Sequence, residues 1–248
     1  HKDGIISASQ VAVAAATQAD DEHTVRPGMV YISMSTELGT MYNRSQLKDL
    51  YYTCKQLGLY LFIDGARLGY GLAAQDCDIT PADVAKFSDV FTVGGTKMGA
   101  LFGEAVVILN PDLKEDFRYL IKQHGGMLAK GRLLGVQFEA LFEGNLFMEL
   151  AQHANSCMDI LRDGIAKLGY KFLVDSPSNQ IFPIFPQNIL DKINEKYMVL
   201  DYMPMDDGSR CVRMVTSWAT DKEQCHNFVK DLEAFNAPTG GEAVGKVK

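Results

Sequence analysis

The sequence predicts an α/β protein with a largely parallel sheet, followed by a smaller α+β domain. Before Pro111, short apolar segments alternate with segments of helical periodicity, and beyond it long helical segments replace this pattern. Such alternation indicates βαβ units, whose strands run parallel because each crossover returns the chain to the same end of the sheet. The 248 residues, 47% of them hydrophobic, suffice for a sizeable core in one or two domains.

The expected elements follow from periodicity and from the residues that begin and end helices. Strands are expected where short apolar runs end at turn residues, at 29–33, 59–63, 89–93 and 105–109. Helices are expected where apolar residues recur at helical spacing, at 10–19, 46–57, 81–87, 112–124 and 129–169. Ser7 or Ser9 would cap the first of these helices, and Ser45 would cap the second. The segments that follow, up to residue 235, indicate a small α+β domain.

The change of pattern also divides the chain into domains. We place the boundary near Asn145, so that a larger domain covers residues 1–145 and a smaller one covers residues 146–236. The last residues, 237–248, are rich in glycine and polar side chains, and we expect a flexible tail there.

Composition excludes several classes of partner. A net charge of -7 and a pI near 5.2 argue against nucleic acid or an anionic membrane as a partner. No apolar run approaches the roughly 20 residues of a membrane span. The five cysteines are odd in number and form no CxxC pair, which favours reduced thiols in the cytoplasm. No group of histidine, cysteine and carboxylate residues has metal-ligand spacing, so no metal is expected.

The stretch LFIDGARLGYG, residues 61–71, places a carboxylate at the end of a predicted buried strand. Asp64 is costly to desolvate there unless a partner is present, and the carboxyl ends of strands are where open α/β sheets bind ligands. A second interpretation is structural: Asp64 caps the following turn and forms an ion pair with Arg67.

A second stretch, VFTVGGTKMGALFGEA, leads from an apolar strand through two glycines to a lysine. Glycine lets the backbone approach a planar ligand, and a partly desolvated Lys97 would have a lowered pKa and a nucleophilic amine. The alternative is an ordinary loop with a solvated lysine. The stretch is not a Walker phosphate loop, because the GxxxxGK[ST] pattern is absent.

Taken together, Asp64 and Lys97 lie at the exits of two strands that are expected to be parallel, and hence at one edge of one sheet. Pyridoxal phosphate needs this pair of groups. Its aldehyde condenses with a lysine amine, and an anionic partner keeps its ring nitrogen protonated. The sequence therefore indicates a pyridoxal-phosphate site.

The segments that carry these signals also resemble a known family. FIDGARLGYGLAA, GGTKMGALFGEAVVI and RMVTSWAT are similar to segments of the L-threonine aldolase/β-eliminating lyase group of fold-type-I pyridoxal-phosphate enzymes. The resemblance implies an aspartate aminotransferase-like large domain with a mostly parallel sheet, plus a small C-terminal α+β domain. It also implies that Asp64 holds the pyridine nitrogen, that Lys97 carries the cofactor, and that Gly95 and Thr96 contact it.

The resemblance further implies a set of substrate ligands. Arg67 would face the cofactor oxygen or the amino-acid carboxylate, and Arg213 would bind the substrate carboxylate through its guanidinium fork. Without the resemblance, Arg213 would be an edge-strand arginine that points to solvent. Where the aldolases carry a histidine, this chain reads SMSTELGT, so Glu37 is either a replacement base or a surface residue.

We interpret the protein as a lyase that cleaves L-threonine or L-allo-threonine to glycine and acetaldehyde. β-Elimination or transamination on the same scaffold is one alternative, and a non-catalytic fragment or degenerate homologue is another. Family members carry a phosphate-binding turn and a ring-stacking residue upstream of the segment matching HKDG. We therefore expect a chain that lacks its N-terminal part and binds the cofactor weakly on its own.

The family builds its sites at a subunit interface, so a homodimer or homotetramer is expected. The segment KQHGGMLAKGRLLG, with His124, Lys130 and Arg132, is the candidate subunit contact, the alternative being a helix end with solvated charges. His153 and His226 lie on helices with polar neighbours and are expected at the surface.

Overall fold

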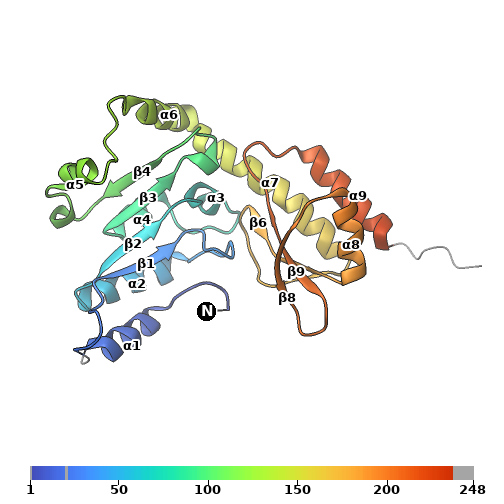
Figure 1. The fold of residues 1–248 in the computed structure, drawn as a ribbon, viewed down its shortest axis with the longest axis horizontal. Coiled ribbons are helices and arrows are strands. Elements are labelled where there is room, and N and C mark those ends of the chain that lie inside the picture. The colour runs from blue at the N-terminus through green and yellow to red at the C-terminus, as the bar shows by residue number, and fades with distance from the viewer. Residues whose placement is uncertain (1, 20–21, 237–248) are drawn as a thin grey trace, which may run out of the picture.

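A computed structural model describes residues 2–19 and 22–236 of the chain. It has two lobes, which the long helix α7 (Leu146–Lys167) joins (Figure 1). His1 and the expected flexible tail at 237–248 lie outside the described residues. Within the described ranges, no helix is both long enough and apolar enough to cross a membrane.

The first lobe is built on a four-stranded sheet, in the order β1-β2-β3-β4. Its strands are β1 (Met29–Ser33), β2 (Tyr60–Asp64), β3 (Val90–Gly94) and β4 (Glu104–Ile108). The first three strands run parallel, and β4 is antiparallel to β3. The strand prediction is confirmed for β1, and the other three strands begin and end one residue from their predicted bounds.

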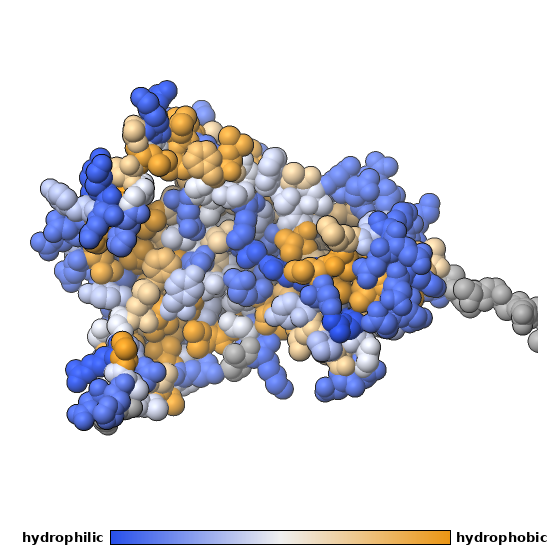
Figure 2. Space-filling model, viewed as in Figure 1, coloured by the Kyte–Doolittle hydropathy of each residue, from blue (hydrophilic) through white to orange (hydrophobic). Residues whose placement is uncertain are grey.

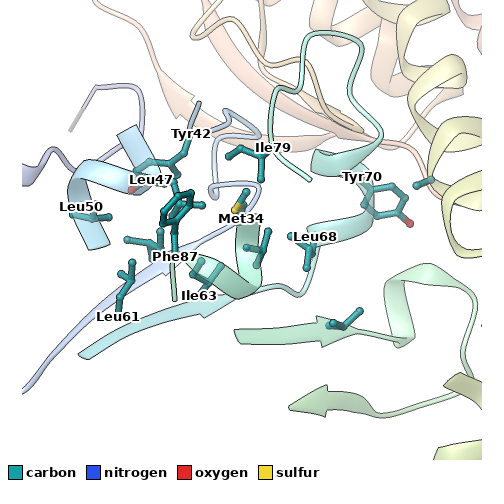
Figure 3. Close-up of a cluster of buried hydrophobic side chains, with 14 of the residues drawn as sticks. Met34, Tyr42, Leu47, Leu50, Leu61, Ile63, Leu68, Tyr70, Ile79 and Phe87 are labelled. Carbon is teal, nitrogen blue, oxygen red and sulfur yellow. The ribbon is translucent and has the colours of Figure 1, made fainter. Parts of the chain in front are cut away.

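One face of this sheet carries the core of the lobe. It is covered by α2 (Arg44–Gln56) and α4 (Pro81–Lys86), with α1 (Ala8–Ala19) packed against α2, while α3 (Leu68–Leu72) follows β2. Figure 3 shows Leu61 and Ile63 of β2 pointing toward Leu47 and Leu50 of α2, and all four side chains are fully buried. Asp64 projects to the other face because side chains alternate along a strand. That face is more open, and Tyr31 is 51% exposed on it.

The helix caps differ in part from the prediction. Ser7 precedes α1, and its hydroxyl accepts a hydrogen bond from the N–H of Gln10, so that cap is confirmed. The prediction of Ser45 as a cap is wrong. Asn43 is the N-cap of α2, with its side chain accepting the N–H of Gln46 in a capping box. Ser45 lies inside the first turn of α2, so it is one of the residues whose backbone N–H groups have no intrahelical acceptor, and it does not precede the helix as a cap does.

Two of the predicted long helices are interrupted. Asp116, with φ 54°, separates the 3-10 turn η2 (Pro111–Leu113) from α5 (Phe117–Gln123). The segment 129–169 contains α6 (Arg132–Phe142), a bend, and then α7. The bend lies at Gly144 and Asn145, whose φ values of 59° and 74° cannot continue a right-handed helix. Asn145, near which we placed the domain boundary, lies at this bend.

The second lobe contains an antiparallel sheet in the order β5-β7-β9-β6, with β8 paired to β9. Its elements are β5 (Lys171–Phe172), β6 (Gln180–Ile181), β7 (Pro183–Phe185), α8 (Gln187–Lys196), β8 (Leu200–Pro204), β9 (Arg210–Val215) and α9 (Lys222–Asn236). Its core lies between this sheet and the helices α7, α8 and α9, and includes Ile165, Ile193 and Leu232, which are fully buried. An α+β organisation of this part of the chain is thereby confirmed.

Candidate active site

The exits of β2 and β3 lie side by side because glycine occupies both. The N–H of Gly94 donates to the carbonyl oxygen of Gly65 over 3.0 Å. A Cβ atom on Gly65 would lie 1.8 Å from the carbonyl oxygen of Thr92, and one on Gly94 would lie 2.5 Å from the carbonyl oxygen of Ala66. No larger residue fits without moving the backbone. Asp64 and the turn that follows Gly94 are thus brought to one edge of the sheet.

The carboxylate of Asp64 accepts two hydrogen bonds. Its Oδ1 accepts the N–H of Ala66 at 2.9 Å, so Asp64 does cap the following turn. Its Oδ2 accepts the hydroxyl of Tyr31, whose ring stacks on Phe62 with 5.3 Å between ring centroids. The hydrogen bond to Asp64 and burial raise the pKa of Tyr31 to about 12, so this hydroxyl remains a donor at neutral pH. The carboxylate is therefore held on the open face of the sheet.

Lys97 lies three residues beyond β3, in the 3-10 turn η1 (Thr96–Met98), and its side chain is exposed. Partial burial of the ammonium group lowers its pKa, and the guanidinium of Arg67 lowers the pKa further. The carboxylates of Glu37, Asp64 and Glu104 act in the opposite direction without reversing the shift. Proximity to three carboxylates and a guanidinium distinguishes Lys97 from an isolated solvated lysine.

A buried tyrosine holds the backbone at Lys97 through a hydrogen bond. The hydroxyl of Tyr70, a residue only 1% exposed, donates to the carbonyl oxygen of Lys97. Burial raises the pKa of Tyr70 to about 12, which keeps this donor protonated. Figure 3 shows the Tyr70 ring at the end of the core cluster, with its hydroxyl directed away from the cluster.

Arg67 and Arg213 approach each other from different lobes. Burial of Arg67 lowers its pKa, and the charge of Arg213 lowers it further. The guanidinium of Arg213 is half-buried and donates from Nε and Nη2 to Oε1 of Gln180, at 3.2 and 2.8 Å. The alternative interpretation, in which Arg213 points to solvent, is therefore wrong. Both guanidinium groups belong to the same cluster of charges as Lys97.

Glu37 lies at the rim of this cluster. Its Oε2 is 4.0 Å from Nη1 of Arg67, and its side chain is 75% exposed. The alternative pairing of Arg67 with Asp64 does not occur among the salt bridges of the described residues. Glu37 is thus both exposed and close to Arg67, which fits the two interpretations that the sequence leaves open.

Gly95 and Thr96 occupy the turn between β3 and Lys97. Gly95 is buried, and a Cβ atom there would meet the ring of Phe138 at 2.8 Å and the carbonyl oxygen of Gly103 at 2.9 Å. The close approach that Gly95 allows is therefore to the chain itself. Thr96 is exposed next to Lys97.

Sequence reasoning missed three residues of the site: Tyr31, Tyr70 and Gln180. Tyr31 could have been inferred from the alternation of side chains along parallel strands. Gln180 is a single amide at the start of the apolar run QIFPIF, a signal for a buried polar group with specific partners. No sequence signal identifies Tyr70, because its contact with Lys97 depends on how α3 packs.

The other candidate residues lie elsewhere. His124, Lys130 and Arg132 are exposed at or between the ends of α5 and α6, and His226 is exposed on α9 as expected. His153 is a correction: it is half-buried, and its Nε2 lies 2.7 Å from the carbonyl oxygen of Thr220. No group of three or more metal-ligating side chains occurs in the part of the chain that the structure describes.

A cavity of about 540 Å³ lies apart from the charged cluster. It opens between the N-terminal segment and the 173–177 loop, and it contains none of the predicted site residues. Four aspartates line it, namely Asp3, Asp76, Asp78 and Asp175. The predicted site residues thus lie outside this cavity.

The chain belongs to the beta-eliminating lyase family, whose model matches residues 1–187. Its fold is of the aspartate aminotransferase type, since an aspartate aminotransferase of Thermus thermophilus aligns with a TM-score of 0.64 at 16% identity, over 93% of this chain and 60% of that one. A solved structure of Leishmania major threonine aldolase aligns with a TM-score of 0.92 at 43% identity, over 94% of this chain and 68% of that one. The family resemblance in the sequence is confirmed.

Two curated relatives are also similar in sequence to this chain. The chain is 31% identical to a low specificity L-threonine aldolase of Pseudomonas aeruginosa over 220 residues, which cover 88% of this chain and 62% of the relative. It is 32% identical to another from a Pseudomonas species over 223 residues, covering 88% of the chain and 63% of the relative. The chain therefore spans about three fifths of the length of these relatives.

Proposed function

We propose that this protein is a pyridoxal-phosphate-dependent carbon–carbon lyase that cleaves L-threonine or L-allo-threonine to glycine and acetaldehyde. One observation carries the proposal: Asp64 and Lys97 lie at adjacent strand exits that the contact between Gly65 and Gly94 holds together. Membership of the lyase family and the threonine aldolases among the similar proteins support it.

The residues present fit the cofactor. Lys97 offers an exposed amine with a lowered pKa, which increases the fraction of the neutral, nucleophilic form. Asp64 offers a carboxylate on the open face of the sheet, and its hydrogen bonds come from one N–H and one hydroxyl, neither of which is charged. The negative charge of Asp64 therefore stays available for a protonated ring nitrogen. Pyridoxal phosphate, when bound, withdraws electrons from the bond that breaks.

Each side chain of the cluster then has a role. Lys97 Nζ would carry the cofactor and, once released, accept or return a proton. Arg213 would bind the substrate carboxylate, because the half-buried guanidinium presents a planar fork of donors. Arg67 would contact the cofactor oxygen or the same carboxylate. Glu37, beside Arg67, is the candidate base for the proton of the substrate β-hydroxyl.

The alternatives differ in what the site does after it binds an amino acid. Among the alternatives, β-elimination is favoured, because the chain belongs to the beta-eliminating lyase family. Release of pyruvate and ammonia from serine would identify it, whereas acetaldehyde from threonine identifies the aldolase. A protein that binds no cofactor would be the non-catalytic homologue.

We also propose a homodimer or homotetramer that works in the cytoplasm. Large apolar side chains are exposed on α6 and on the neighbouring turns, where Figure 2 shows an orange area over α6. They are Leu101, Phe102, Leu128, Leu133, Val136 and Phe142. A contiguous apolar surface of this kind is typical of a protein interface. All five cysteines are free and four are buried, which suits a reducing compartment.

Absorption spectroscopy of the full-length protein tests the proposal. Added pyridoxal phosphate should produce a visible absorption band, and borohydride should trap the cofactor on the peptide that contains Lys97. Lys97→Ala should lose the band and stay folded, while Lys48→Ala, an exposed lysine on α2, should behave as wild type. Absence of the band, or trapping at another lysine, would rule out the assignment.

A further inference from the structure

We propose that Gln180 is a positioning residue that orients Arg213 toward the substrate carboxylate without neutralising its charge. The inference rests on the proposed function, and it concerns a residue that sequence reasoning did not select. Gln180 is fully buried, begins β6, and pairs through its backbone with Val215 of β9. Arg213 lies two residues before Val215, on the same face of the sheet.

The partners of Gln180 determine the orientation of its amide. Oε1 accepts from Nε and Nη2 of Arg213, which has donors only. Nε2 donates at 3.1 Å to the carbonyl oxygen of Thr36, which is an acceptor only. A flipped amide would place two donors together and two acceptors together. The side chain is therefore locked in one orientation, and so is the guanidinium it holds.

This arrangement occupies one edge of the guanidinium and leaves the other edge open. The oxygen of Gln180 takes the Nε–Nη2 edge, so Nη1 and the second Nη2 proton remain for a carboxylate. The anchor is an amide, and no carboxylate of the described residues forms a salt bridge with Arg213. The positive charge of Arg213 is thus kept for an anionic ligand.

The same amide joins the two lobes. Thr36 begins the turn that carries Glu37, and its carbonyl oxygen also accepts the N–H of Gly39. A Cβ atom on Gly39 would lie 2.7 Å from Cγ of Gln180, so this turn packs directly on the side chain. Gln180 therefore sets the position of Arg213 relative to the turn in the lobe that contains Lys97 and Asp64.

Two substitutions separate the effect of neutralising the charge of Arg213 from the effect of losing the orientation of its guanidinium. Gln180→Glu gives Arg213 a counter-ion and should raise the KM for L-threonine about tenfold or more, with kcat within about twofold of wild type. Gln180→Met keeps the volume and the free charge but loses the anchor, and should raise KM about threefold, clearly less than Gln180→Glu does. Gln224→Glu, an exposed position on α9, adds the same charge and should leave KM unchanged.

A second measurement needs neither cofactor nor turnover. The Nε–H signal of Arg213, identified by its loss in Arg213→Lys, is followed in ¹H–¹⁵N spectra while glycine is added. Wild type and Gln224→Glu should show a saturable shift, and Gln180→Glu should bind glycine about tenfold more weakly. Ethanolamine, which lacks the carboxylate, should cause no shift in any of these proteins.

The outcomes are distinguishable. A wild-type protein that neither binds the cofactor nor cleaves threonine refutes the proposed function, and the glycine titration then decides the role of Gln180 alone. The inference is overturned if Gln180→Glu binds glycine as wild type does, or if Gln180→Met and Gln180→Glu have equal effects. It is also overturned if glycine leaves the Arg213 signal of the wild type unchanged. Gln180→Met serves as the test if Gln180→Glu does not fold.

Discussion

The N–H of Gly94 donates a hydrogen bond to the carbonyl oxygen of Gly65, with 3.0 Å between the two atoms. This bond joins the exit of β3 to the exit of β2, and neither glycine leaves room for a Cβ atom. The segments that carry Asp64 and Lys97 are therefore held in one relative position by backbone contacts. We expect changes at the glycines to affect folding and changes at the two side chains to affect chemistry.

Gly65→Ala should destabilise the protein by about 1–3 kcal/mol or more, because the new methyl group meets the carbonyl oxygen of Thr92, a backbone atom that cannot move without disturbing β3. Gly135→Ala is the control. It lies inside α6 with no atom within 4 Å of an added Cβ, and should be neutral or stabilise by up to about 1 kcal/mol. Urea unfolding measures both, and equal effects would contradict the close contact.

Asp64→Asn should retain the cofactor but slow threonine cleavage by about 10²-fold or more, because a neutral amide cannot hold the proton on the ring nitrogen. The fold should persist, since an amide oxygen can still accept the N–H of Ala66. Steady-state kinetics and the visible spectrum check the two parts separately. Asp49→Asn, at an exposed position of α2, is the control. A normal rate in Asp64→Asn would refute its assignment.

Arg213→Lys should raise the KM for L-threonine about 10- to 100-fold with little loss of stability, since a point charge replaces a fork and one charged hydrogen-bonded pair contributes about 1.5–3 kcal/mol. The lysine also loses the second bond to Oε1 of Gln180. Kinetics and thermal unfolding should be compared with Arg26→Lys, an exposed arginine. An unchanged KM would remove Arg213 from the substrate site.

Asp89 should make stability depend on pH. It is 3% exposed, and burial alone would raise its pKa, but hydrogen bonds from Lys55 Nζ, the N–H of Leu61 and Asn110 Nδ2 lower the pKa below its usual value. A lowered pKa stabilises the fold above the unfolded value of about 3.9, and this contribution is lost as the pH falls through the folded value.

Asp89→Asn should accordingly destabilise the protein by about 3 kcal/mol at pH 7, and the difference from wild type should shrink toward pH 3. Urea unfolding across this range measures the difference. Asp49→Asn should show no such trend. A difference that stays constant with pH would mean that the ionised carboxylate contributes nothing to folding.

The four strands of the first lobe were predictable to within one residue because apolar runs bounded by turn residues appear directly in the sequence. The bounds of the long helices were less predictable. Asp116, Gly144 and Asn145 adopt positive φ values inside segments that keep helical periodicity, and periodicity does not report the conformation of one residue. The cap at Asn43 was missed because Ser45 and Asn43 are both good caps, and the choice depends on which one meets the N–H of Gln46.

The sequence by itself determined the fold class and the family, and it selected Asp64, Lys97 and Arg213 as candidates, because these depend on local pattern and on recognisable segments. Only the tertiary structure decided which residues support them. Tyr31 reaches Asp64 across 33 positions of the chain, Tyr70 reaches Lys97 across 27, and Gln180 reaches Thr36 across 144. The physical reason is that a hydrogen bond requires two groups within about 3 Å of each other. For residues far apart in the sequence, that distance is set by how the chain packs and cannot be read from their positions in the sequence.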